Sequence, residues 1–309
     1  MSRLLIQTSN PLCQLQDAGR FGVRHLGVTQ GGAADGLSMA WANRLLGNAS
    51  GAAVIEITLG GLSLVAQDDC TLALAGADLA AAIDGQPLKP WRSFSLNTGQ
   101  TLTFTQPLIG ARAYLAAPAG FIAPQVLGSC ATVVREQLGG PDGLGRALLA
   151  GDELSYDGLA LPVRELALEQ RPVFNPHPLL DMVMGAQLGA FSGQSTFDAF
   201  NSPWTLDSRA DRMGIRLLGP ALVYQGAPMI SEGIPLGAIQ VPPDGQPIVL
   251  LNDRQTIGGY PRLGALTPLA LARLAQCLPG EQVYLRAVTQ EAAQGEHVRH
   301  ARQLESPSP

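Results

Sequence analysis

The chain has 309 residues and a formal net charge of −5, and 46% of its residues are hydrophobic. This length suits about two domains, and the acidic balance argues against nucleic acids and anionic membranes as partners, because both require a basic face. The 36 glycines and 23 prolines favour a β-rich fold with many turns.

Cysteine and histidine spacing predicts neither a zinc site nor a disulfide framework. The cysteines lie far apart without CxxC spacing, and the four histidines show no metal-ligand spacing. The N-terminus lacks the basic, apolar and small-residue pattern of a signal peptide, and no apolar run approaches the length of a membrane span. We therefore expect a cytoplasmic enzyme with incidental thiols, at Cys13, Cys70, Cys130 and Cys277.

Lys89 is the only lysine, and its setting excludes several cofactor chemistries. It lies in QPLKPW, which is neither a glycine-rich phosphate loop nor the Met-Lys turn that carries biotin. A Schiff base on this proline-flanked residue is improbable. Arginine takes the remaining cationic roles, which favours bidentate recognition of carboxylates.

The first half of the chain reads mostly as strands. A strand is expected from Leu4 to Ser9, and a helix over 36–46 with Asp35 as its N-cap and Gly47 as its stop. Asp84-Gly85 predicts a hairpin turn. Alternating or apolar runs predict further strands at AAVIEITLG, LSLVA, TLALAG, LAAAIDGQPL and TLTFTQ.

A proline-punctuated segment, 157–177, is the predicted linker between two β-rich domains at 1–160 and 175–290. The second half is expected to begin with a strand at LDMVMG, to contain a helical turn at FDAFNSPW, and to end in a polar, mobile tail over 291–309. Because βαβ alternation and GxGxxG are missing, small closed β-barrels are favoured over Rossmann sheets.

Three sequence matches in the same order suggest that the two halves arose by duplication. DAGRFGVRHLG (17–27) matches RADRMGIRLLG (209–219), Gln30-Gly31 matches Glu232-Gly233, and TLGG (58–61) matches TIGG (256–259). In this alignment the polar run 252–255 is aligned with the more apolar run 54–57. The asymmetry predicts that the chemistry lies in the second half, with Gln30, Asp35 and Glu56 contributed by the first.

The stretch from Gly237 to Gly264 is the strongest candidate for one wall of a binding site. A predicted buried strand over 247–251 runs directly into the polar cluster NDRQT, followed by the pair Gly258-Gly259. Charged groups are costly to bury unless they are paired, and glycines allow close approach of a ligand. The alternative is a tight loop with an internal ion pair, Asp253–Arg254 or Asp253–Arg262.

Two more polar clusters could carry chemistry. SRADRMG (208–214) crowds Arg209, Asp211 and Arg212 before a glycine, as either a solvated loop or an arginine clamp for a carboxyl group. Ser231-Glu232-Gly233 presents an acid beside a flexible turn, although Glu232 could equally cap a helix or pair with an arginine. The candidate catalytic residues are Asp253, Arg254, Arg212 and Glu232, and the candidate substrate-binding residues are Gln240, Thr256, Gly258, Gly259, Tyr260, Asp211, Gln30 and Asp35.

Several long motifs resemble the biotin-dependent carboxyltransferase family. They include QDAGRFGVRHLGV, GGAADGLSMAWANRLLGN, RAYLAAPAGF and SEGIPLGAIQVPPDGQPIVLLNDRQTIGGYPRLG, within a match over about 16–288. Branches of this family are the allophanate hydrolase subunit 2 group, part of the urea carboxylase carboxyltransferase domain, a sporulation-kinase-inhibitor antagonist and the C subunit of 5-oxoprolinase. The resemblance implies a mainly β fold of two tandem cyclophilin-like β-barrel domains with a few short helices.

The resemblance also implies a function that depends on partner subunits. The main expectation is a subunit of ATP-dependent 5-oxoprolinase, which opens 5-oxoproline to L-glutamate together with homologues of the A and B subunits and is active only in the complex. ATP would then act at the level of the complex. One alternative is transfer of a carboxyl group from carboxybiotin, on a separate chain, to urea or a related amide. A second is a non-catalytic protein that binds a regulator.

Under the main expectation, Arg212, Arg254 and the amides of Gly258-Gly259 would stabilise an anionic oxygen, and Asp253 or Glu232 would move protons. Two departures from the family pattern bear on the substrate. GGAAD (31–35) stands where relatives commonly have SGAMD, and GSCAT (128–132) stands where they commonly have GSRST. The second removes an arginine; if that arginine binds substrate in relatives, either the substrate differs here or its role has moved to Arg135.

Overall fold

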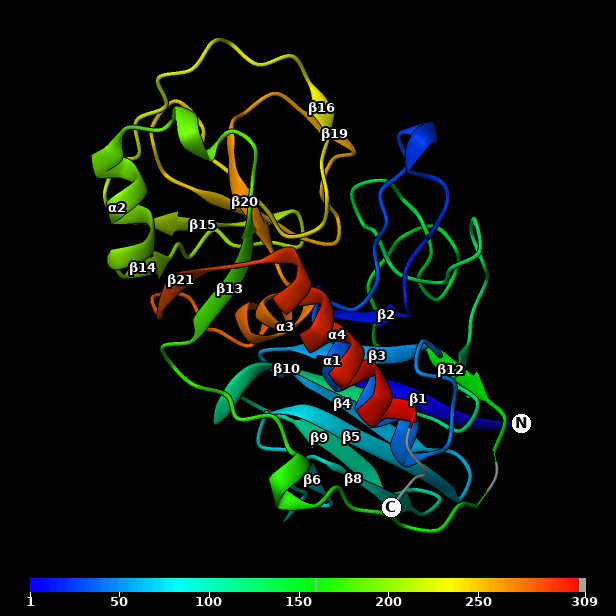
Figure 1. The fold of residues 1–309 in the computed structure, drawn as a ribbon. Coiled ribbons are helices and arrows are strands. Elements are labelled where there is room, and N and C mark those ends of the chain that lie inside the picture. The colour runs from blue at the N-terminus through cyan, green and yellow to red at the C-terminus, as the bar shows by residue number, and fades with distance from the viewer. Residues whose placement is uncertain (159, 306–309) are drawn as a thin grey trace. The chain divides into compact units, whose positions relative to one another are not determined.

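The computed structural model describes residues 1–158 and 160–305, which form two compact units. Among these residues, the first unit comprises 1–21, 31–158, 160–173 and 304–305, and the second comprises 22–30 and 174–303. The fold is mainly β with short helices, as the sequence predicts (Figure 1). No helix in the described ranges is long and apolar enough to cross a membrane.

Two antiparallel sheets build the first unit around one core. The seven-stranded sheet has the order β11-β12-β1-β4-β9-β6-β7, and the five-stranded sheet has the order β2-β3-β10-β5-β8. Buried side chains from both sheets form a shared hydrophobic cluster. The elements are β1 (Ser2–Thr8), β2 (Cys13–Gln16), α1 (Gly36–Leu45), β3 (Val54–Thr58), β4 (Leu62–Ala66), β5 (Cys70–Asp78), β6 (Ala82–Ile83), β7 (Gln86–Pro87), β8 (Arg92–Leu96), β9 (Thr101–Phe104), β10 (Ile109–Ala116), β11 (Phe121–Ile122), β12 (Glu153–Tyr156) and the 3-10 helix η2 (Leu168–Gln170).

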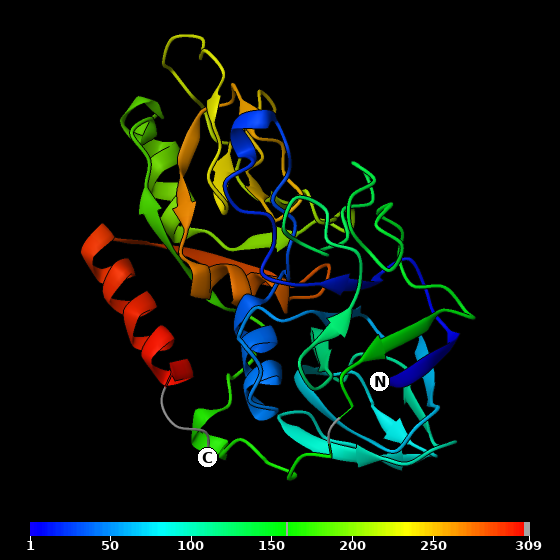
Figure 2. The same ribbon diagram turned by 90° about the vertical axis from the view of Figure 1, so that its right-hand side faces the viewer.

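The second unit is a closed barrel with the strand order β13-β20-β17-β18-β15-β14-β21, in which only the pairing of β13 with β21 is parallel. Helix α2 packs beside β21 and α3 beside β13 (Figure 2). The elements are η1 (Arg24–Leu26), β13 (Leu179–Met184), η3 (Leu188–Ala190), α2 (Gly193–Asn201), β14 (Trp204–Leu206), β15 (Gly214–Leu218), β16 (Glu232–Gly233), β17 (Ala238–Gln240), β18 (Ile248–Leu250), β19 (Ile257–Gly258), β20 (Arg262–Leu266), α3 (Pro268–Ala275) and β21 (Gln282–Val288).

Local sequence signals account for several element ends. The Asp35 carboxylate accepts a hydrogen bond from the Ser38 amide at 3.0 Å and begins α1, as expected of an N-cap. Thr267 caps α3 in the same way, ahead of Pro268. Asp84 and Gly85 both have positive φ, at 47° and 81°, as the turn between β6 and β7 requires.

The predicted linker is only partly a linker. The part of this segment up to residue 173 belongs to the first unit. There, Ser93 N donates to Arg164 O at 2.8 Å and Leu166 N donates to Trp91 O at 2.9 Å. Leu166 is fully buried. The boundary between the units falls between Val173 and Phe174. One residue of the predicted linker, 159, lies outside the described residues.

The predicted mobile tail is wrong for most of its length, because residues Gln290–Glu305 form the helix α4. The segment is polar, which suggested mobility, but it is rich in Ala, Glu, Gln and Arg, which are strong helix formers. The last part of the prediction, 306–309, lies outside the described residues.

The repeat matches do not align equivalent structure. In the first match, Arg24 lies in the 3-10 helix η1 whereas its counterpart Arg216 lies in the strand β15. The segment 17–27 is also divided between the two units at residues 21 and 22. The run 54–57 lies inside β3, whereas 252–255 forms a loop after β18. These two runs therefore occupy different structural positions, and their difference in polarity does not support placing the chemistry in the second half.

Candidate functional site

The polar cluster after β18 is a tightly held loop of the second unit. Leu251 N donates to Met213 O and Asp253 N donates to Arg212 O, both at 2.9 Å. Arg254 N turns back onto Leu251 O at 3.2 Å. These backbone bonds join the loop to the segment that precedes β15, so two of the three predicted polar clusters are neighbours.

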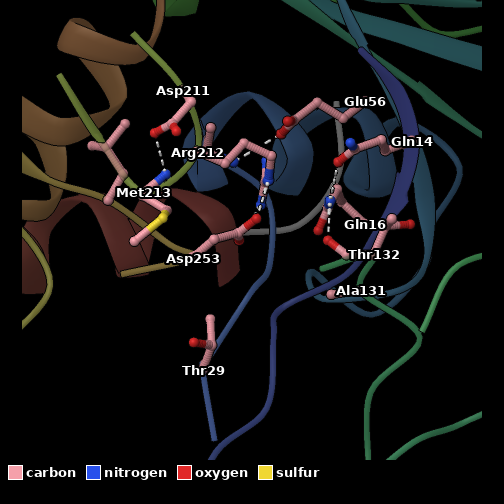
Figure 3. A network of polar contacts seen from close by, with 12 residues as sticks. Gln14, Gln16, Thr29, Glu56, Ala131, Thr132, Asp211, Arg212, Met213 and Asp253 are labelled. Atoms are coloured by element: carbon pink, nitrogen blue, oxygen red, sulfur yellow. Dashed lines mark hydrogen bonds and ion pairs between the residues drawn. The ribbon is translucent and has the colours of Figure 1, made fainter. Parts of the chain in front are cut away.

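Asp253 and Arg212 form a buried ion pair with two contacts (Figure 3). Arg212 Nε lies 3.1 Å from Asp253 Oδ2, and Arg212 Nη2 lies 3.2 Å from Oδ1. The side chains are 16% and 8% exposed, respectively. The predicted pairings of Asp253 with Arg254 or Arg262 are wrong, because the carboxylate faces a residue 41 positions earlier in the chain.

Arg254 supports backbone carbonyls in the second unit. Its side chain is 2% exposed, and it donates from Nε to Ile234 O and from Nη1 to Leu251 O, both at 3.2 Å. Its own carbonyl accepts the Thr29 hydroxyl at 3.2 Å. Since the guanidinium already holds two carbonyls, we assign Arg254 to positioning the loop that carries Asp253.

The third cluster also forms an ion pair. Glu232 accepts from Arg262 Nη2, and its Oε1 accepts from Gln187 Nε2 at 3.1 Å. Arg262 also donates to the carbonyl of Gly233 at 3.3 Å. The structure thus gives Glu232 the arginine partner that was one of its three sequence interpretations.

A pocket of about 360 Å³ opens in the second unit. It brings together three of the predicted substrate-binding residues, Gln240, Tyr260 and Asp211, whereas Asp253, Arg212 and Glu232 are not part of its lining. Its complete lining is Asp207, Arg209, Asp211, Met213, Gly214, Arg216, Gln240, Ile248, Leu250, Gln255 and Tyr260. Among these, Ile248 and Leu250 lie on the predicted buried strand, but sequence alone offered no reason to connect them with Asp207.

Three further predicted binding residues lie close to this region. A Cβ placed on Gly258 would lie 3.0 Å from Gln240 Nε2 and 2.5 Å from Ile234 Cδ1, so glycine permits this close packing. Gly259 faces Ser231, whose Oγ would lie 3.4 Å from such an atom. Thr256 contributes its backbone carbonyl, which accepts from the Arg24 guanidinium at 3.2 Å.

The remaining predicted binding residues have other settings. Asp35 belongs to the first unit, where its Oδ2 accepts the Ser38 hydroxyl at 2.6 Å in addition to the cap described above. Gln30 is half-buried in the second unit. The structure therefore does not place Asp35 and Gln240 in one unit, and we leave Asp35 out of the proposed site as the N-cap of α1.

The first unit contains buried polar contacts around Glu56 and Gln16, of which the sequence analysis named only Glu56. Glu56 accepts from Ala34 N at 2.8 Å and from the Tyr114 hydroxyl at 2.9 Å. Gln16 Nε2 donates to Gln14 Oε1 and to Thr132 O, both at 3.1 Å (Figure 3). Burial raises the pKa of Tyr114 well above its ordinary value. Two glutamines within a four-residue buried strand were the available signal.

The loop that departs from the family pattern is fixed from inside the first unit. The Asp17 carboxylate accepts from Ser129 Oγ at 2.6 Å and from Cys130 N at 2.8 Å, and the fully buried Arg20 donates to Ala131 O at 2.7 Å. Cys130 is fully buried, and burial, followed by the nearby Asp17 carboxylate, raises the pKa of its thiol to about 12. Arg135 is exposed, and the transfer of an arginine role to it stays a prediction.

The cationic groups of the pocket have carboxylate partners. Arg209 Nη2 lies 2.5 Å from Asp207 Oδ2, and Arg216 pairs with Asp244. The hydrogen bond from the Arg209 side chain is the main cause that lowers the pKa of Asp207 to about 2. Asp207 therefore stays ionised through the physiological range, and its charge cancels that of Arg209.

We expect the pKa of Asp207, followed through the chemical shift of its carboxyl carbon in a ¹³C NMR titration of the folded protein, to be about 2. In Arg209→Ala the midpoint should rise toward that of an ordinary aspartate, because the guanidinium no longer favours the charged form. A lowered folded pKa stabilises the fold above the unfolded pKa, and this contribution is lost as the pH falls through the folded pKa. A wild-type midpoint at the ordinary value would contradict the pairing.

The described residues contain no group of three or more His, Cys, Asp or Glu side chains placed to hold a metal ion.

The chain matches one family model and two proteins that share a name. The model of a family described as "Carboxyltransferase domain, subdomain A and B" matches residues 26–287. The chain is 38% identical over 284 residues to the C subunit of 5-oxoprolinase from Haemophilus influenzae, with 90% of the chain and 89% of the relative covered. It is 35% identical over 288 residues to the protein of the same name from Escherichia coli, with the same coverage.

A solved structure supports the fold. The structure of K. lactis urea amidolyase superimposes with a TM-score of 0.90 at 23% identity, covering 98% of this chain and 20% of that protein. At this identity the likeness concerns the fold, and the chain corresponds to about one fifth of that longer protein.

Proposed function

Because this chain belongs to the carboxyltransferase-domain family, with matched residues 26–287, we propose that it is a subunit of an ATP-dependent 5-oxoprolinase. The observation that carries the proposal is the 38% identity, over nearly the full length of both chains, to a protein named as the C subunit of 5-oxoprolinase. The complex would open 5-oxoproline to L-glutamate. The partners would be homologues of the A and B subunits, and activity would require the assembled complex.

Ring opening breaks the lactam C–N bond, with water adding hydroxyl to the carbonyl carbon and a proton to the nitrogen. The reaction needs a stabiliser for the anionic oxygen that develops and a group that moves protons. Asp253 and Arg212 are the proposed pair for these roles, since they lie in contact and are largely shielded from water. Arg212 orients Asp253 and balances its charge, and Arg254 ties the loop that carries Asp253 to Ile234.

The residues of the pocket do not fit a nucleotide triphosphate. Phosphate sites need unpaired cationic groups or a cradle of backbone amides, whereas Arg209 and Arg216 are each paired with an aspartate. We therefore assign ATP to the assembled complex and derive no step through it in this pocket. ATP hydrolysis would supply the driving force for opening the ring.

The runner-up is carboxyl transfer to urea or a related amide, which the match to a carboxyltransferase-domain family favours. It would require biotin on a separate chain. The only lysine of this chain, Lys89, lies in QPLKPW and not in the Met-Lys turn that carries biotin.

Reconstitution separates these two functions. We expect this chain, purified alone, to produce no glutamate from 5-oxoproline and ATP, and the complex with homologues of the A and B subunits to produce glutamate and phosphate together. Robust activity of the lone chain would contradict the proposed dependence on partners. Turnover of urea that requires a biotin carrier, without turnover of 5-oxoproline, would replace the main proposal by the runner-up.

A further inference from the structure

The pocket of the second unit has a largely apolar floor on one face of the barrel. Gly214 of β15 pairs with Leu250 of β18, and two residues further on Arg216 pairs with Ile248. These four residues line the pocket, whereas Ile215 is buried in the core. Because side chains alternate along a strand, the lining residues share the face that points away from the core. The floor can therefore cover the methylene groups of a small ligand.

Arg216 brings a guanidinium with an uncommitted edge to this floor. Its Nη1 pairs with Asp244, which is 52% exposed, so water weakens the pair. Among the described residues, none accepts a hydrogen bond from Nε or Nη2 of Arg216. These two N–H groups form the fork that binds a carboxylate through two parallel hydrogen bonds. The pairing with Asp244 therefore orients Arg216 and leaves this fork for a ligand.

Asp211 supplies the opposite charge at the start of the same strand. Its Oδ1 accepts from Met213 N at 2.8 Å and from Gly214 N at 3.0 Å (Figure 3). Its Oδ2 accepts no hydrogen bond within the described part of the chain. From Gly214, Arg216 lies two residues and about 7 Å further along the strand. An anchored carboxylate and a guanidinium thus line one small pocket.

The other charges of the lining cancel each other. Arg209 Nη2 lies 2.5 Å from Asp207 Oδ2 in an ion pair. The lining is left with one anion and one cation that can each take a ligand, Asp211 and Arg216. Neither a simple cation nor a polyanion matches this arrangement, whereas an α-amino acid carries an ammonium and a carboxylate on one carbon atom. The volume of about 360 Å³ is at the small end of the range for ligand sites, which suits a molecule of this size.

We propose that this pocket binds the α-amino acid group of L-glutamate, with the ammonium donating to Asp211 Oδ2 and the α-carboxylate accepting from Arg216 Nε and Nη2. The inference rests on the proposed function, whose product is L-glutamate. Opening of the lactam converts an uncharged ring nitrogen into an ammonium group, so Asp211 attracts the product more strongly than the substrate. Asp253 and Arg212 are not part of the lining, which fits a site for released product rather than for the reacting ring.

The test is an NMR titration of the full chain, without partners, with L-glutamate and with 5-oxoproline. Both ligands carry a single negative net charge near neutral pH, but only L-glutamate has an ammonium group. The backbone amides of Met213 and Gly214, which donate to Asp211, report binding in this pocket. We expect L-glutamate to shift both signals with a dissociation constant in the millimolar range or below, and 5-oxoproline to bind at least about fivefold more weakly.

Asp211→Asn removes the charge that distinguishes the two ligands. The side-chain oxygen of asparagine can still accept from Met213 N and Gly214 N, so the turn before β15 should persist. L-glutamate should bind at least about fivefold more weakly, and the preference over 5-oxoproline should disappear. Asp198→Asn is the matched control and should bind as wild type, since Asp198 is outside the lining and its Oδ1 accepts from Gln194 Nε2 at 2.8 Å.

Arg216→Lys tests the other half of the site. Lysine keeps the positive charge but lacks the planar fork, so both ligands should bind at least about fivefold more weakly, because both carry a carboxylate. Absence of shifts at Met213 and Gly214 with L-glutamate, tighter binding of 5-oxoproline than of L-glutamate, or wild-type affinity in either Asp211→Asn or Arg216→Lys would overturn the proposal.

The outcome is distinguishable from that of the complex assay. Binding of L-glutamate that depends on Asp211, together with a reconstituted complex that does not turn over 5-oxoproline, would keep the pocket as an amino acid site and remove the proposed enzyme. Turnover by the complex without Asp211-dependent binding would remove the pocket assignment alone.

Discussion

Asp253→Ala should lower the free energy of unfolding by about 3–5 kcal/mol, which is the usual effect of removing one member of a buried ion pair. The carboxylate is 8% exposed and receives two contacts from Arg212, which is itself 16% exposed. Without Asp253 the guanidinium keeps its charge in a place where water reaches it poorly. Chemical denaturation followed by circular dichroism measures the effect.

Two controls show whether the loss comes from breaking the ion pair. Arg212→Leu combined with Asp253→Leu removes both charges and should be less destabilising than the sum of the two single changes, because the two residues share one interaction. Asp244→Ala breaks the pair with Arg216, in which Asp244 is 52% exposed, and should cost at most about 1 kcal/mol. If the losses in free energy of unfolding of the two single variants add up to that of the double variant, the expected coupling between Arg212 and Asp253 is absent. If Asp244→Ala and Asp253→Ala cost the same free energy, burial does not determine the strength of the Arg212–Asp253 pair.

Asp253→Asn should reduce glutamate formation by the reconstituted complex by at least about a hundredfold, the usual size of general acid–base catalysis. Asparagine keeps the shape of the side chain but can no longer take up a proton as a carboxylate does. The measurement is kcat for 5-oxoproline, expressed per folded complex after the stability of the variant has been determined.

Asp181→Asn is the matched control for this activity measurement. It makes the same chemical change in another Arg–Asp pair of the same unit, in which Arg286 Nε lies 2.6 Å from the buried Asp181 Oδ1, and neither residue is part of the pocket lining. Turnover should stay near the wild-type value. If Asp253→Asn also turned over at the wild-type rate, Asp253 would have no part in the chemistry and the pair with Arg212 would be structural.

Local features of the fold were predictable because short-range chemistry determines them. Asp35 is followed three residues later by an amide that its carboxylate can cap, so the start of α1 is encoded in four residues. The hairpin at Asp84-Gly85 needs only two residues that tolerate positive φ. The buried strand at Ile248–Leu250 follows from an apolar run bounded by prolines and polar residues.

The partners of charged residues were not predictable in this way. Sequence proximity suggested Arg254 or Arg262 for Asp253, but consecutive side chains on a tight loop point in different directions, and backbone hydrogen bonds bring Arg212 to the carboxylate. Which charged residues form a pair therefore depends on how segments far apart in the sequence are aligned by backbone hydrogen bonds. The same holds for Gln240, which lies at a shift in pairing between β17 and β20 that no short sequence pattern predicts.

Sequence resemblance supplied what local patterns could not. The long motif ending in NDRQTIGGYPRLG predicted the family that the comparisons then showed. Internal matches between the halves were misleading, since Arg24 and Arg216 fall in a 3-10 helix and a strand. Short motifs of Arg, Gly and Leu recur for different structural reasons, whereas a motif of more than thirty residues carries information about tertiary arrangement.

Omission of one component from the reconstituted complex tests the central claim most directly. Homologues of the A and B subunits would be assayed for ATP-dependent conversion of 5-oxoproline to glutamate, with and without this chain. We predict that glutamate forms only when this chain is present and that adding the purified chain back restores the rate. Equal rates with and without it would contradict its assignment as a functional subunit of 5-oxoprolinase.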